Sequence, residues 1–147
     1  MDIKKKPRKR RRQSQELIER RFNDKKWEVR CTLAGRLDWT PTSEQFKIGL
    51  TDDHYLVREA WAYRKDLVLT QDLIEIGLTD DWVDNRIKWA AMYFEWLDAK
   101  RGTPTLEQLE RGLNDASGRV SSIWMRMVKS QLCKLFADDD SSTVHSI

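Results

Sequence analysis

The chain has 147 residues, of which 35% are charged and 39% belong to the hydrophobic set, and its formal net charge is +3. This length suits one domain of ordinary size. No run of about 18 apolar residues occurs, which excludes a membrane-spanning helix, and the basic N-terminus lacks the apolar stretch of a secretory signal.

The net charge divides the chain into a basic arm and an acidic body. Residues 1–12 hold eight of the 27 Lys and Arg and one of the 24 acids, which leaves 19 basic and 23 acidic residues in 13–147, a net charge of −4. So dense a run of like charge repels itself, and we expect residues 1–13 to form a disordered arm. Its cations are Lys4, Lys5, Lys6, Arg8, Lys9, Arg10, Arg11 and Arg12.

The composition of the arm favours a polyanionic partner. Phosphate backbones accept clustered Lys and Arg, and such binding releases counterions and depends on salt. A basic run of this kind also resembles a nuclear-import signal, and a third interpretation is a solubilising tail. We favour nucleic acid, and the other two interpretations stay open at this stage.

One short pattern recurs four times behind the arm. The first two steps between copies are 28 residues and the last is 35. A fixed period in this range predicts stacked supersecondary units. The copies begin at Ser14, Thr42, Thr70 and Thr105, and each contains an aligned Asp at Asp24, Asp52, Asp80 and Asp115.

Each copy reads as a helix, a tight turn and a second helix. In the second copy, Thr42 and Gln45 have the spacing of a capping box, Phe46 and Leu50 share one face of a short helix, and Asp52 lies in the turn before the second helix. We expect short helices near 15–21, 43–50, 71–78 and 106–113, and long helices near 25–37, 53–65, 81–100 and 116–136.

These elements predict an all-α fold, a right-handed alpha-solenoid of four helix–turn–helix repeats with a C-terminal capping helix. Residues 14–137 would form this domain, and 138–147 a flexible acidic and polar tail. One aligned column should form the seam between long helices, with Leu33, Trp61, Trp89 and Trp124. A second column should let helices approach closely, with Gly49, Gly77 and Gly112.

An arginine follows six residues after the aligned Asp in three copies, giving Asp24/Arg30, Asp52/Arg58 and Asp80/Arg86. This pattern resembles the HEAT repeat, and the short period is also similar to bacterial leucine-rich-variant arrays. The resemblance implies a ladder of charge-assisted bonds along a helical stack, a scaffold for binding. In the last copy Ser121 stands at the arginine position, as would suit a terminal cap.

Candidate partner-binding residues lie on the second helices. Arg36, Arg64 and Lys88 could project from a concave face, and Trp82 occupies a position that is polar in the other copies. Seven extra residues, 94–100, lengthen the third long helix. They either form a binding edge that includes Trp96, or they place Phe94 and Trp96 over the C-terminal helix.

No catalytic or metal-binding constellation is evident. His54 and His145 have no companions at ligand spacing, and no glycine-rich phosphate loop occurs. We therefore expect no cofactor, metal or small-molecule substrate. Two cysteines in different repeats favour a reduced compartment, the cytoplasm (nucleoid included) or the nucleus.

The sequence thus favours a non-enzymatic helical-repeat binding module that engages nucleic acid or a nucleic-acid-bound protein machine. The first alternative is a protein–protein adaptor, or a phage or mobile-element inhibitor of host machinery, without direct nucleic-acid contact. A further alternative is an enzyme similar to the DNA glycosylases built from HEAT-like repeats.

Overall fold

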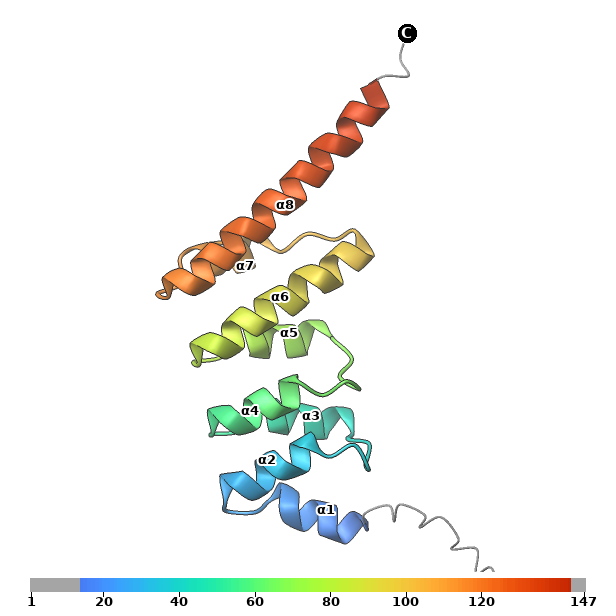
Figure 1. The fold of residues 1–147 in the computed structure, drawn as a ribbon, viewed down its shortest axis with the longest axis vertical. Coiled ribbons are helices and arrows are strands. Elements are labelled where there is room, and N and C mark those ends of the chain that lie inside the picture. Colours follow the sequence, from blue (N-terminus) through green and yellow to red (C-terminus); the bar gives the residue numbers. More distant parts are fainter. Residues whose placement is uncertain (1–13, 144–147) are drawn as a thin grey trace, which may run out of the picture. The chain divides into compact units, whose positions relative to one another are not determined.

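The computed structural model describes residues 14–143, with side chains described as far as residue 137 (Figure 1). Over this range the chain is entirely helices and their connections, without a strand. The helices are α1 (Gln15–Phe22), α2 (Trp27–Gly35), α3 (Ser43–Leu50), α4 (Tyr55–Ala62), α5 (Gln71–Leu78), α6 (Val83–Lys100), α7 (Leu106–Leu113) and α8 (Gly118–Thr143). The all-helical prediction is confirmed.

The first helix of each copy begins at its predicted cap. Each cap side chain accepts a hydrogen bond from the backbone N–H of the residue three positions later in the sequence. The four cap residues are Ser14, Thr42, Thr70 and Thr105. The predicted capping box is present, because the Thr42 backbone N–H also donates to the Gln45 side chain. These bonds satisfy backbone donors that a helix N-terminus otherwise leaves without a partner.

Two second helices are shorter than expected. We predicted 25–37 and 53–65, but α2 covers Trp27–Gly35 and α4 covers Tyr55–Ala62. The turn explains the late start, because the Asp24 carboxylate accepts the Lys26 N–H and holds the intervening backbone outside the helix. Arg36 then adopts an extended conformation and ends α2.

The last helix is longer than expected. We predicted an end near residue 136 and a domain boundary at 137, whereas α8 continues to Thr143. The sequence after Gly118 contains neither glycine nor proline. No residue in this stretch therefore forces the helix to stop.

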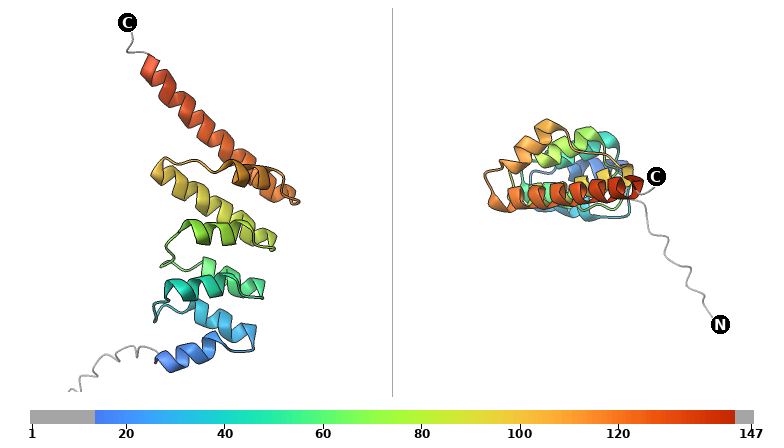
Figure 2. Two further views of the ribbon diagram at one scale, coloured as in Figure 1. Left: turned by 180° about the vertical axis from the view of Figure 1, so that it is seen from behind. Right: turned by 90° about the horizontal axis from the view of Figure 1, so that it is seen from above.

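The contacts divide the chain into two compact units, with the boundary between Val68 and Leu69. In the first unit α2 packs against α1 and α4, and α3 packs against α4. In the second unit α6 packs against α5 and α8, and α7 packs against α8. Each unit is thus two helix pairs whose second helices lie in contact (Figures 1 and 2).

The predicted tryptophan and glycine columns meet each other inside three helix pairs. Trp61, Trp89 and Trp124 are at most 3% exposed. Each indole lies on the glycine of its own copy, so a Cβ on Gly49, Gly77 or Gly112 would lie 2.2, 1.8 or 2.1 Å from the ring. The glycines are needed because no side chain fits between the indole and the short helix.

The longer α6 completes the core of the second unit. Phe94 is 2% exposed and contacts Trp124 edge to face, with ring centroids 5.1 Å apart. Leu97, one turn further on, is also buried. The burial of Phe94 therefore supports the interpretation in which the extra residues 94–100 pack over the C-terminal helix.

We predict that Gly77→Ala destabilises the protein by at least about 2 kcal/mol. The new methyl group would collide with Trp89, and such overpacking costs about 3 kcal/mol. The better helix propensity of alanine offsets about 1 kcal/mol of this cost. Gly118→Ala is the matched control, because a Cβ there meets no atom within 4 Å. Equal melting temperatures for the two variants would contradict the assigned packing.

Candidate functional site

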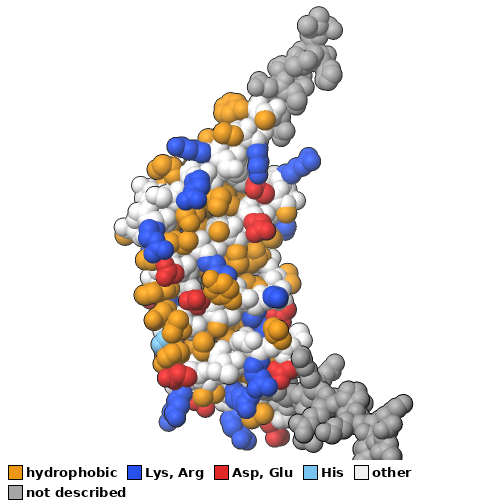
Figure 3. Space-filling view, in the orientation of Figure 1, with side chains coloured by type: hydrophobic (Ala, Val, Ile, Leu, Met, Phe, Trp, Pro, Cys, Tyr) orange, Lys and Arg blue, Asp and Glu red, His pale blue; other side chains and the backbone are white. Residues whose placement is uncertain are grey.

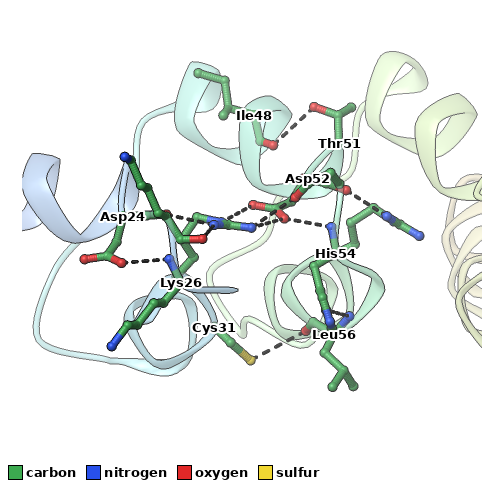
Figure 4. A network of polar contacts seen from close by, with 12 residues as sticks. Asp24, Lys26, Cys31, Ile48, Thr51, Asp52, His54 and Leu56 are labelled. Atoms are coloured by element: carbon green, nitrogen blue, oxygen red, sulfur yellow. Dashed lines mark hydrogen bonds and ion pairs between the residues drawn. The ribbon is translucent and has the colours of Figure 1, made fainter. Parts of the chain in front are cut away.

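A network of polar contacts joins the turns of the first two copies (Figure 4). The Arg30 guanidinium donates from Nε and Nη2 to the two carboxylate oxygens of Asp52, at 2.8 and 3.0 Å. Its Nη1 donates to the backbone carbonyl of Asp24 at 2.7 Å. One arginine thus ties its own turn to the turn of the next copy by a bidentate ion pair.

The same geometry recurs in the second unit. Arg86 donates to both carboxylate oxygens of Asp115, at 2.9 and 3.0 Å, and to the carbonyl of Asp80 at 2.8 Å. The expected contact between Asp52 and Arg58 is confirmed, but through the backbone carbonyl of Asp52, at 2.7 Å. Arg30 and Arg86 therefore each bond the carbonyl within their own copy and the carboxylate of the following one.

These ion pairs hold the aspartates in their charged form. Burial raises the pKa of Asp52, but hydrogen bonds from Arg30 and from the His54 N–H outweigh it and keep the pKa below the ordinary value of 3.8. At Asp115 burial is likewise outweighed by Arg86 and the Ser117 N–H, and the pKa is again lowered. Carboxylates so fixed are suited to structure and poorly suited to accepting a proton in catalysis.

Arg64 corrects one of our site predictions. We expected it to project to a partner, but its side chain is only 2% exposed. Its guanidinium donates to the carbonyls of Ala34, Arg36 and Trp39 and to both carboxylate oxygens of Asp66, and it lies 5.1 Å from the Trp39 ring. Arg64 is therefore a structural clamp for the loop after α2, because every donor is used internally.

The other predicted partner residues differ in their exposure and in their contacts. Arg36 is exposed and paired with Asp38, and Lys88 is half-buried on α6. Trp82 precedes α6 and is 38% exposed, in line with the expected partial exposure. Trp96 is half-buried beneath the Lys100 ammonium, 3.9 Å from the ring. The arm cations Lys4 to Arg12 lie outside the described residues.

The clearest unused surface lies on α8. Met125, Val128, Leu132, Leu135 and Phe136 form an apolar band along one side of this helix, which we call the outer stripe. Four of them are 47–67% exposed, and Val128 is half-buried. On the adjoining face of α8, Val120 and Trp124 are at most 3% exposed and face the core. Orange side chains of this kind are visible on the α8 surface in Figure 3.

The part of α8 that carries the outer stripe is basic. Residues 118–137 contain Arg119, Arg126, Lys129 and Lys134 and no Asp or Glu. Lys134 bonds Asp98 of α6, and Arg119 bonds Asp84. A groove of about 700 Å³ runs between α6 and the start of α8. Its lining consists of Ile87, Ser117, Gly118, Arg119, Ser122, Ile123 and Arg126.

Comparison with known proteins gives no relative: no family model, no curated protein and no solved structure matches the chain. Among the described residues, no group of three or more His, Cys, Asp or Glu could hold a metal ion. None of the described helices has both the length and the apolar character needed to cross a bilayer.

Our sequence reasoning missed two features that the structure makes plain. The outer stripe was overlooked, although Met125, Val128, Leu132 and Leu135 follow a heptad spacing that is visible in the sequence. The Arg64 clamp could not be read from sequence, because its acceptors are backbone carbonyls of a loop 25 to 30 residues earlier.

We predict that Arg64→Ala lowers the free energy of unfolding by about 3 kcal/mol or more. The change leaves buried carbonyls without donors, and each unsatisfied buried group costs about 1–3 kcal/mol. Arg36→Ala is the matched control, because it removes an exposed ion pair and should change chemical denaturation little. Equal stability of the two variants would show that the clamp is not energetically important.

We predict that stability falls with acidification through the two inter-copy ion pairs. A lowered folded-state pKa stabilises the fold above the unfolded-state value, here near 3.8, and this contribution is lost as pH falls below it and through the folded-state value. Chemical denaturation should therefore show that the free energy of unfolding falls less between pH 6 and pH 3 for Asp115→Asn than for the parent, because the variant has already lost this ion pair at pH 6. Glu107→Gln, on the exposed side of α7, should keep the parental profile.

Proposed function

We propose that this protein is a non-enzymatic helical-repeat module that binds nucleic acid through its basic arm. The observation that carries the proposal is the separation of charge, with eight cations in residues 4–12 ahead of a body of net charge −4. The arm needs a polyanion to neutralise it, and a phosphate backbone supplies one at the spacing of successive nucleotides.

The structure of the body supports this proposal in one respect. Several carboxylates that could compete for the arm already hold internal arginines: Asp52 binds Arg30, Asp66 binds Arg64, Glu75 binds Arg111, and Asp115 binds Arg86. Neutralising the arm against the body would require breaking such pairs or fixing the arm on exposed acids. Both cost free energy, whereas an external polyanion requires neither.

We further propose that the four helix pairs continue as one right-handed solenoid of the HEAT-like kind. Two observations support it. The 28-residue spacing of Asp, Gly and Trp persists from the second copy to the third, as in Trp61 and Trp89. The link from arginine to the next aspartate also has the same bonds in both units. A stack of this kind would present the second helices as a binding surface.

The outer stripe of α8 favours a second function, that of a protein–protein adaptor. Contiguous exposed apolar surface on a chain of mean hydropathy −0.72 is typical of an interaction site. One chain can have both functions if the arm binds nucleic acid and α8 binds a protein partner at the same time. The adaptor function stands alone if the arm proves dispensable.

The test is titration of fluorescent duplex and single-stranded DNA at several salt concentrations. With about five phosphate contacts, the slope of log K against log salt should be about −4 to −5 on duplex DNA. Affinity should depend little on base sequence, because backbone contacts do not specify bases.

The matched variant replaces the eight arm cations with glutamine and keeps the length of the chain. It should lose most of the affinity and most of the salt dependence, as should a chain that begins at Gln13. If the parent and the neutralised chain bind equally, or if neither binds at low salt, the nucleic-acid function is wrong and the adaptor function takes its place.

A further inference from the structure

The outer stripe has the geometry of a helix–helix seam. Met125, Val128, Leu132 and Leu135 are separated by three, four and three residues. In an α-helix this alternation keeps the side chains on one narrow band, the arrangement by which paired helices interdigitate. Phe136 lies one turn beyond Leu132 and extends the band. The helix that carries the stripe is already fixed, because α8 also packs on α6 and α7.

The stripe also continues an interface that exists inside the second unit. Residues 35 positions earlier on α6, namely Ala90, Tyr93 and Leu97, align with Met125, Val128 and Leu132, and they are 0–4% exposed. Tyr93 contacts Trp124 of α8, with ring centroids 6.4 Å apart. The face by which α6 receives the next helix is thus repeated on α8, where no described residue covers it.

The charge around the stripe restricts what can cover it. Lys129 is exposed one turn after Met125, beside the stripe, and Arg126 is exposed next to Lys129 on the side that faces away from the stripe; neither has an ion-pair partner among residues 14–137. Residues 118–137 contain no acid that could neutralise them. A helix that lies along the stripe must therefore carry acidic residues at its flanks, because flanking charges decide which helices pair.

We propose that the outer stripe of α8 binds an acidic amphipathic helix of another protein, with an apolar seam against the stripe and Asp or Glu beside Lys129, where the neighbouring Arg126 adds to the positive charge. This goes beyond nucleic-acid binding by the arm and does not depend on it. The partner does not add another repeat of the same kind, because Ser121 replaces the arginine that would reach the next turn.

Two other occupants fit less well. In an antiparallel pair of α8 helices, Met125 would meet Leu135 of the second copy and Val128 would meet Leu132, which places the two-fold axis near residue 130. Lys129 would then lie near Lys129 of the second copy, and this contact between like charges disfavours the pairing. Nucleic acid would neutralise Arg126 and Lys129 but would leave the apolar side chains in water.

The experiment uses the full chain and a synthetic helical peptide with leucine at the seam positions of each heptad and glutamate at the flanks. Binding is followed by fluorescence anisotropy of the labelled peptide. We expect the glutamate peptide to bind, and a peptide with lysine at the flanks to bind at least about ten-fold more weakly. Leu132→Asp should weaken binding of the glutamate peptide at least about ten-fold, because it removes the free energy gained by burying one leucine side chain.

The matched control is Leu106→Asp, which alters a leucine of α7 that is 72% exposed and does not belong to the stripe. It should bind the glutamate peptide like the parent. The double variant Arg126→Glu/Lys129→Glu should reverse the preference and bind the lysine peptide more tightly. That reversal separates a specific seam from general stickiness, and none of these changes is expected to disturb the core.

Each other outcome overturns the proposal. If the glutamate peptide does not bind, or if Leu132→Asp and Leu106→Asp reduce its affinity equally, the outer stripe is not the binding site. A concentration-dependent dimer in sedimentation equilibrium that Leu132→Asp converts to monomer assigns the stripe to a second copy. Loss of DNA affinity in the Arg126→Glu/Lys129→Glu variant, with no peptide binding by the parent, assigns the face to nucleic acid.

Discussion

The contact between an indole ring and a glycine determines how each of three helix pairs is built. Trp61, Trp89 and Trp124 lie so close to the short helix that a single methyl group on the facing glycine would enter the ring. This fixes the distance and the rotation between the two helices of a pair. The first pair has Leu33 instead of a tryptophan. The Trp39 indole N–H donates to the Leu33 carbonyl, and Trp39 and Phe46 both lie against Trp61.

A second constraint joins successive pairs, and it is electrostatic. Arg30 and Arg86 each bond a carbonyl in their own turn and a carboxylate in the next. The arginine is half-buried and bidentate at both places, so the bonds specify orientation as well as energy. At Ser121 this link ends, which leaves α8 with a repeat-like apolar face but without the arginine that would engage a further copy.

The two constraints explain why we propose binding sites in the basic arm and on α8. The Asp and Arg residues of the turns are used in packing, and Arg64 is used to close a loop. What remains for partners is the basic arm, argued from composition, and the surface of α8, argued from geometry. They differ in chemistry, one being purely cationic and the other apolar with a cationic border, and this difference is why we assign them to different classes of partner.

The sequence by itself determined the helical elements, their caps and the identity of the buried columns. These follow from local rules: hydroxyls that cap at Thr42 and Thr105, and a period that repeats the same contacts at Trp61 and Trp89. The tertiary structure alone decided which partner each polar group takes. Arg64 looked available on a helix face, yet backbone carbonyls distant in sequence surround it. The exposure of the outer stripe was likewise decided by packing, because a heptad of apolar residues reads the same in a sequence whether a neighbouring helix covers it or not.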